Sequence, residues 1–89
     1  MSWTLRDIAV RILPTYRRKL LEGNLIYKAV PAPNDEHMRV LYTVWTTFVD
    51  TSGMLEPDCA YCMADILNNF KQLQPVLVEL EQEAALLEL

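Results

Sequence analysis

The amino-acid sequence predicts an all-α protein: a small helical bundle of three to four helices with a Pro-rich connector and a long C-terminal helical segment. Apolar residues recur at three- and four-residue spacing in separate stretches, which is the period of an amphipathic helix. The chain has 89 residues, 52% of them hydrophobic, and only two glycines. This length fits one domain, and the composition supplies a core. We therefore expect a single helical domain over residues 1–89.

The first predicted helix covers residues 4–22. Thr4 can cap its N-terminus, with Asp7 in the capping-box position three residues later. Its apolar stripe consists of Leu5, Ile8, Ile12, Tyr16 and Leu20. Pro14 removes the backbone hydrogen bond to the Val10 carbonyl, so we expect the helix to be kinked or split there.

Residues 25–33 form the predicted Pro-rich connector, after a stop signal at Gly23-Asn24. Pro31 and Pro33 favour extended backbone in the residue that precedes each of them. Because the segment is also rich in apolar residues, we expect an ordered connector that lies against the core.

The second predicted helix covers residues 35–50, with Asn34 as its N-cap. Its apolar positions are Met38, Leu41, Trp45 and Phe48. Many other residues here are β-branched, which is typical of strands. However, apolar residues stand side by side instead of alternating with polar ones, so a helix is favoured over a strand.

The third predicted segment covers residues 57–88 and begins with Pro57, which suits the first helical position. Its apolar residues follow one heptad seam: Met63, Ile66, Phe70, Leu73, Leu77, Leu80, Ala84 and Leu87. Pro75 lies opposite this seam, so we expect the segment to be bent or broken near it.

The expected core draws on all three segments. Its members are Trp3, Ile12, Tyr16, Leu41, Trp45, Phe48, Met63 and Phe70. Such a core covers the first part of the heptad seam, and the stretch from Leu77 to Leu87 adds about 15 Å of apolar edge beyond it. A second copy or another protein would cover that edge. The predicted interaction residues are Leu73, Leu77, Leu80, Ala84 and Leu87.

Charge is divided unevenly between the two halves of the chain. Residues 1–49 have seven basic and four acidic side chains, whereas residues 50–89 have one basic and eight acidic. The favoured interpretation is that the acidic C-terminal helix packs beside the basic first helix; the alternative is that the acidic tail docks onto a basic partner. The net charge of −4 makes nucleic acid an unlikely partner. No apolar stretch reaches the roughly 20 residues of a membrane span.

One group of basic residues stands out within this pattern. Arg11, Arg17, Arg18 and Lys19 lie close together, with Tyr16 beside them. This group is the best candidate for a phosphate contact, but ordinary solvation of a helix end is favoured.

The motif Cys59-Ala-Tyr-Cys62 is the one pair of residues with a recognisable spacing. A redox site would need a preceding strand in a βαβ frame, which the sequence does not supply. A zinc site would need further ligands, either His37 or the Cys pair of a second copy. Packing of two small buried thiols is the favoured interpretation. Two cysteines are too few for a disulfide scaffold, and Asp7 falls where a signal peptide would be apolar, so we expect a cytoplasmic protein.

The sequence also lacks the usual marks of an enzyme. His37 is the single histidine, and no glycine-rich phosphate loop is present. We therefore expect no catalytic activity and no required cofactor.

Three stretches carry a resemblance: Tyr16-Arg-Arg-Lys-Leu-Leu-Glu-Gly-Asn-Leu-Ile-Tyr-Lys-Ala-Val-Pro, Asp58-Cys-Ala-Tyr-Cys, and Asn69-Phe-Lys-Gln-Leu-Gln-Pro-Val-Leu. In these the chain resembles small uncharacterised proteins of phages and mobile elements of gut bacteria. The resemblance implies a bacterial host cell and a role as a structural accessory or as a binder of a host protein. It implies no reaction and no functional residues.

The expected function is therefore that of a non-enzymatic protein-interaction module, which self-associates or binds a host or virion protein through its C-terminal helix. The alternative is a zinc-stabilised nucleic-acid-binding or regulatory protein that uses Cys59 and Cys62.

Overall fold

The computed structural model describes residues 4–87, and this part of the chain folds as an all-α bundle without strands, as predicted. Its elements are α1 (Leu5–Arg11), α2 (Pro14–Leu21), the 3-10 turn η1 (Glu22–Asn24), α3 (Leu25–Lys28), α4 (Glu36–Phe48) and α5 (Ala60–Leu87). The long C-terminal helix predicted from the heptad seam is thus confirmed.

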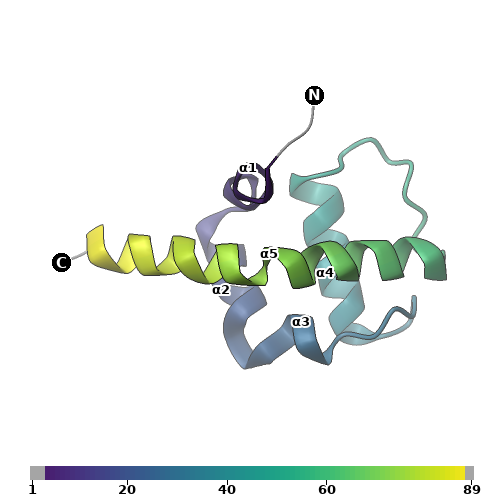
Figure 1. Ribbon diagram of the computed structural model, residues 1–89. Coiled ribbons are helices and arrows are strands. Elements are labelled where there is room, and N and C mark those ends of the chain that lie inside the picture. The colour runs from purple at the N-terminus through teal and green to yellow at the C-terminus, as the bar shows by residue number, and fades with distance from the viewer. Residues whose placement is uncertain (1–3, 88–89) are drawn as a thin grey trace.

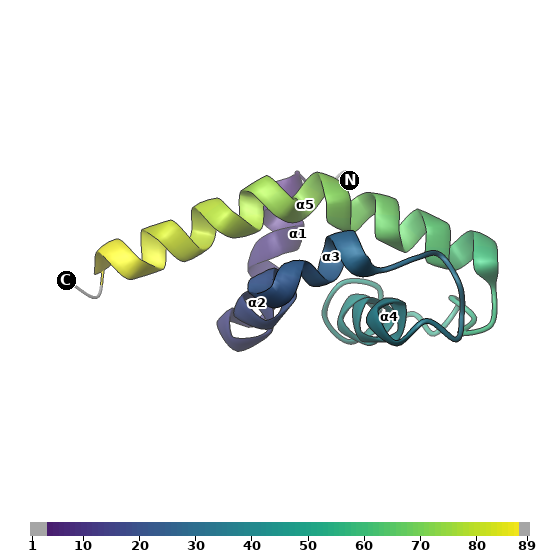
Figure 2. The ribbon, with the colours of Figure 1, turned by 90° about the horizontal axis from the view of Figure 1, so that it is seen from below.

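Helix α5 runs the length of the molecule, and α1 to α4 lie on one side of it (Figures 1 and 2). Each of these four helices contacts α5. In both views the C-terminal end of α5 extends beyond the other helices. Helix α5 therefore forms one side of the core, against which the other four helices pack, and its last turns lie outside the bundle.

The predicted helix over residues 4–22 is split into α1 and α2 at Pro14, the first residue of α2. Proline disfavours helical geometry in the residue before it, and Leu13 is accordingly extended. The predicted capping box is present: Thr4 Oγ1 accepts from the Asp7 N–H at 3.1 Å, and Asp7 Oδ2 accepts from the Thr4 N–H at 3.0 Å. The hydrogen bonds from Thr4 lower the pKa of Asp7, so the cap is strongest when this carboxylate is ionised.

The predicted connector over residues 25–33 begins with a helical turn, α3, which corrects the expectation of a connector without helix. The two prolines restrict only the residues directly before them, so they leave the start of the segment free to become helical. The chain changes direction just ahead of α3, where Gly23 and Asn24 have positive φ angles of 64° and 57°. Glycine and asparagine are the residues that best tolerate this left-handed geometry.

Helix α4 is shorter than the predicted 35–50 and is capped by Asp35 instead of Asn34. Asp35 Oδ2 accepts from the backbone N–H three residues later at 2.9 Å. The helix was favoured over a strand, and this is confirmed. The hydroxyls of Thr43 and Thr46 donate to the carbonyls four residues earlier, at 2.8 and 2.9 Å. These bonds let β-branched threonines fit a helix.

Helix α5 begins at Ala60, so the prediction that Pro57 is its first residue is wrong. The residues before it form a turn, in which the Cys59 N–H donates to the Glu56 carbonyl at 3.3 Å. Pro75 does not break the helix, which bends near its middle (Figure 2). Because Pro75 is exposed, water can bond the carbonyl that the proline leaves unpaired.

Most of the predicted core is buried. Its buried members are Ile12, Leu41, Trp45, Met63 and Phe70. Phe48 is partly buried, and Tyr16 is exposed, because its ring packs on that of Phe48 from outside with the centroids 5.1 Å apart. The placement of Tyr16 in the core was therefore wrong. Trp3 lies outside the described residues.

The predicted interaction seam on α5 is largely internal. Leu73 and Leu77 are fully buried and Leu80 is 7% exposed. These three side chains belong to the core because α1 and α2 pack against α5 and cover the face that we expected another protein to cover. This corrects their assignment as interaction residues. Ala84 is partly buried, and Leu87 lies outside the core.

Ion pairs join the acidic part of α5 to α1 and α2. Arg6 lies 2.8 Å from Glu83 and 3.9 Å from Glu79, and Arg17 Nε lies 3.6 Å from Glu81 Oε1. The interpretation that the acidic C-terminal helix packs beside the basic first helix is thus confirmed. The pair of Arg17 and Glu81 differs from the others because its side chains are only 12% and 19% exposed.

We predict that Leu77→Ala lowers the free energy of unfolding by about 2–5 kcal/mol, because it leaves a cavity in the core. Leu87→Ala removes the same group from the same seam, but at an exposed position, and should have almost no effect. Urea denaturation followed by circular dichroism measures both. Equal effects of the two substitutions would show that the core does not extend to Leu77.

We also predict that Glu81→Gln lowers the free energy of unfolding by about 1–3 kcal/mol, because the Arg17 guanidinium then lies half-buried without a carboxylate. Glu79→Gln is the matched control, since Glu79 is well exposed and should contribute little. The same denaturation experiment applies. A destabilisation by Glu79→Gln as large as that by Glu81→Gln would contradict this view of the buried pair.

Candidate functional site

The exposed end of α5 is the part of the predicted interaction surface that remains outside the core. Leu86 and Leu87 are 69% and 88% exposed on the turns that extend past the bundle (Figure 1). Ala84, one turn earlier, is partly buried. Leu86 was not among the predicted interaction residues because it lies one position off the heptad seam. We call Ala84, Leu86 and Leu87 the α5 tip.

The two cysteines lie at the opposite end of α5. Both are free and partly buried. Cys59 directly precedes the helix, and its Sγ accepts from the Cys62 N–H at 3.1 Å, as the side chain of an N-cap does. Side-chain hydrogen bonding with Cys59, followed by burial, raises the pKa of the Cys62 thiol. A redox-active cysteine needs a lowered pKa, so the raised pKa of Cys62 does not favour a redox role.

The candidate metal ligands are not brought together. Within residues 4–87 no group of three or more His, Cys, Asp and Glu side chains could hold one metal ion. His37 lies at the start of α4, as predicted, where its Nε2 is 3.8 Å from Glu36 Oε1. The structure therefore does not place His37 with Cys59 and Cys62 in one cluster.

A groove between α2 and α4 was missed by the sequence analysis. It is a hollow of about 230 Å³ lined by Tyr16, Lys19, Arg39, Val40, Thr43 and Val44. A second hollow adjoins it and shares Tyr16 and Lys19, adding Thr15, Arg18 and Glu22. The basic cluster in the sequence was a signal for this surface. The contribution of Arg39 could not be seen, because it depends on how α4 packs.

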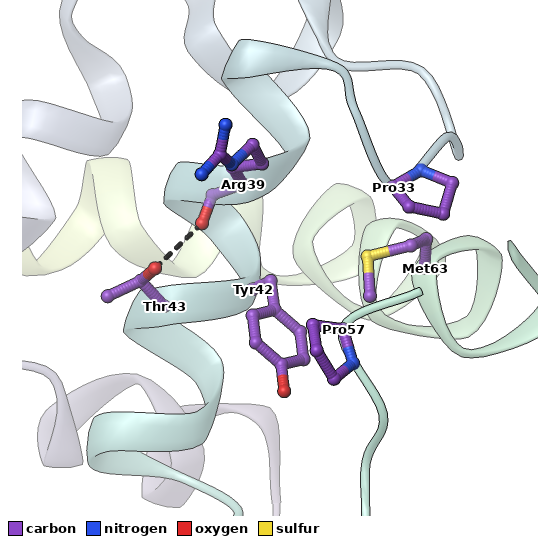
Figure 3. Close-up of a pocket in the computed structure, with 6 residues that line it drawn as sticks. All are labelled: Pro33, Arg39, Tyr42, Thr43, Pro57 and Met63. Atoms are coloured by element: carbon purple, nitrogen blue, oxygen red, sulfur yellow. Dashed lines mark hydrogen bonds between the residues drawn. The ribbon is translucent and has the colours of Figure 1, made fainter. Parts of the chain in front are cut away.

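A third hollow, of about 200 Å³, continues from the groove on the other side of Arg39 and Thr43 (Figure 3). Tyr42, Pro57 and Met63 face one another across it, and the Arg39 guanidinium turns away from them. The Tyr42 hydroxyl donates to the Leu55 carbonyl at 2.8 Å, which ties the loop before α5 to α4. The lining of this hollow therefore combines apolar and polar groups, and no carboxylate, histidine or cysteine is among its lining residues.

Comparison with protein-family models, curated proteins and solved structures finds no match to this chain. Among the helices that the structure describes, none combines the length and the apolar character needed to cross a membrane.

We predict that Cys59→Ser keeps or slightly raises the stability of the protein, because a hydroxyl oxygen is a better N-cap acceptor than a thiol. Cys59→Ala, which removes the acceptor, should lower the free energy of unfolding by about 0.5–1 kcal/mol. Denaturation of both variants measures the difference, and metal analysis of the purified parent accompanies it. Stoichiometric zinc in the parent that is lost in both variants would show that Cys59 binds metal instead of capping the helix.

Proposed function

We propose that this protein is a non-enzymatic protein-interaction module that self-associates or binds another protein through the α5 tip. The observation that carries the proposal is the exposure of Leu86 and Leu87, two adjacent leucines on helical turns that extend past the bundle. Burying a leucine side chain that is otherwise exposed contributes about 1.5–3 kcal/mol. Burial of the two leucines of the tip against a partner would therefore contribute to the free energy of binding.

The surroundings of the tip support a partner that combines a small apolar contact with basic groups around it. The chain after Lys71 contains four glutamates and no basic residue. Glu79 and Glu83 are on the surface beside Arg6, where they would form a polar rim around a contact made by the leucines. The resemblance to proteins of phages and mobile elements fits an accessory of this kind, acting in the cytoplasm of a bacterial host.

We predict that Leu86→Asp together with Leu87→Asp abolishes self-association or capture of a protein partner, while the helical circular dichroism spectrum is unchanged. Sedimentation velocity measures the first, and pull-down from bacterial lysate measures the second.

The matched control is Met54→Asp together with Tyr61→Asp. It removes two side chains that are 83% and 84% exposed and adds the same charge away from the tip. This control should behave like the parent protein. Loss of binding in the control alone, or equal binding by all three proteins, would place the interaction surface elsewhere.

A further inference from the structure

We propose that the groove between α2 and α4 is the acceptor for the α5 tip of a second copy of this chain. This proposal rests on the proposed function, because it names the partner of the same tip. The two surfaces are opposite in charge, and the apolar side chains of the groove can receive the exposed leucines of the tip.

The groove is a cationic site. Lys19 and Arg39 line the hollow, and Arg18 lies in the hollow that adjoins it. Within residues 4–87 no carboxylate lies within salt-bridge distance of these three side chains, whereas Arg6 and Arg17 are paired with α5. One carboxylate, Glu22, also lines the adjoining hollow, so the three cations leave this face with a net positive charge.

The turns of α5 that lead to the tip supply the complementary charge. Glu79 and Glu83 are exposed and share one cation, Arg6, and such exposed ion pairs lose little when they rearrange. An acidic helix end that approaches a cationic groove is favoured by long-range attraction as well as by the final contact.

The groove also has an apolar floor for the leucines. Val44 is buried, Val40 is partly buried, and Tyr16 forms one wall. A cavity of about 150 Å³ holds a benzene-sized group. The hollow of about 230 Å³ therefore has room for a leucine side chain of the tip.

The tip of one chain does not reach its own groove. In both views the C-terminal end of α5 extends away from α4, which forms one side of the groove (Figures 1 and 2). The contact must therefore join two copies. Because donor and acceptor are different surfaces, a mutual exchange of tips closes a dimer, whereas a one-way exchange builds a chain of molecules.

Sedimentation velocity at high micromolar concentration tests the proposal. The groove variant is Lys19→Glu with Arg39→Glu, and the tip variant is Leu86→Ser with Leu87→Ser, which removes the apolar side chains without adding charge. Each should raise the dissociation constant for self-association at least about tenfold. Lys28→Glu with Lys71→Glu makes the same change of charge at exposed positions and should associate like the parent.

Mixing the two variants is the decisive measurement. The tip variant keeps an intact groove and the groove variant keeps an intact tip, so an equimolar mixture should form a complex that neither variant forms alone. Circular dichroism confirms that both remain folded. Higher salt should weaken the complex, because the exposed charges are screened.

Three outcomes would overturn the proposal: a monomeric parent, a mixture that stays monomeric, or a groove variant that associates like the parent. If only the groove variant associates normally, the tip remains the binding surface and the proposed function survives. If the tip variant also associates like the parent, the proposed function fails as well.

Discussion

Burial of the apolar stripe of α5 is the interaction on which the rest of the structure depends. Helices α1, α2 and α3 have seven, eight and four residues, and isolated helices of such lengths are unstable in water. They persist because each packs against α5, where Phe70 and Leu77 are fully buried. Pro75 is compatible with this role because it lies on the exposed face, so its effect on the backbone does not interrupt the stripe.

This dependence explains why the heptad seam correctly predicted the buried face of α5 but wrongly predicted that another protein covers that face. Periodicity shows which face of a helix is buried, but it does not show whether the same chain or another chain covers that face. At Leu77 and Leu80 the covering groups come from within the chain. Beyond Glu83, which still pairs with Arg6 of α1, the described end of α5 extends past the other helices (Figures 1 and 2).

The features predicted well from the sequence are those decided within a few residues. The Thr4–Asp7 capping box and the split at Pro14 depend on neighbouring backbone groups, and both are present. Cys59 was missed as a cap because thiols are unusual in that position. The groove was missed for a different reason: Lys19 and Arg39 are twenty residues apart and line one hollow because α2 and α4 both pack against α3 and α5.

Because of the helical period, the basic side chains of α2 point in different directions and contact different surroundings. Neighbouring residues on an α-helix point about 100° apart, so Arg17, Arg18 and Lys19 cannot all face one partner. Arg17 points toward α5 and is half-buried beside Glu81, while Arg18 and Lys19 are exposed. A single acidic helix packed on one side of α2 thus neutralises only part of this cluster. The remainder lines the groove and the hollow beside it, where one acidic side chain, Glu22, accompanies the basic ones.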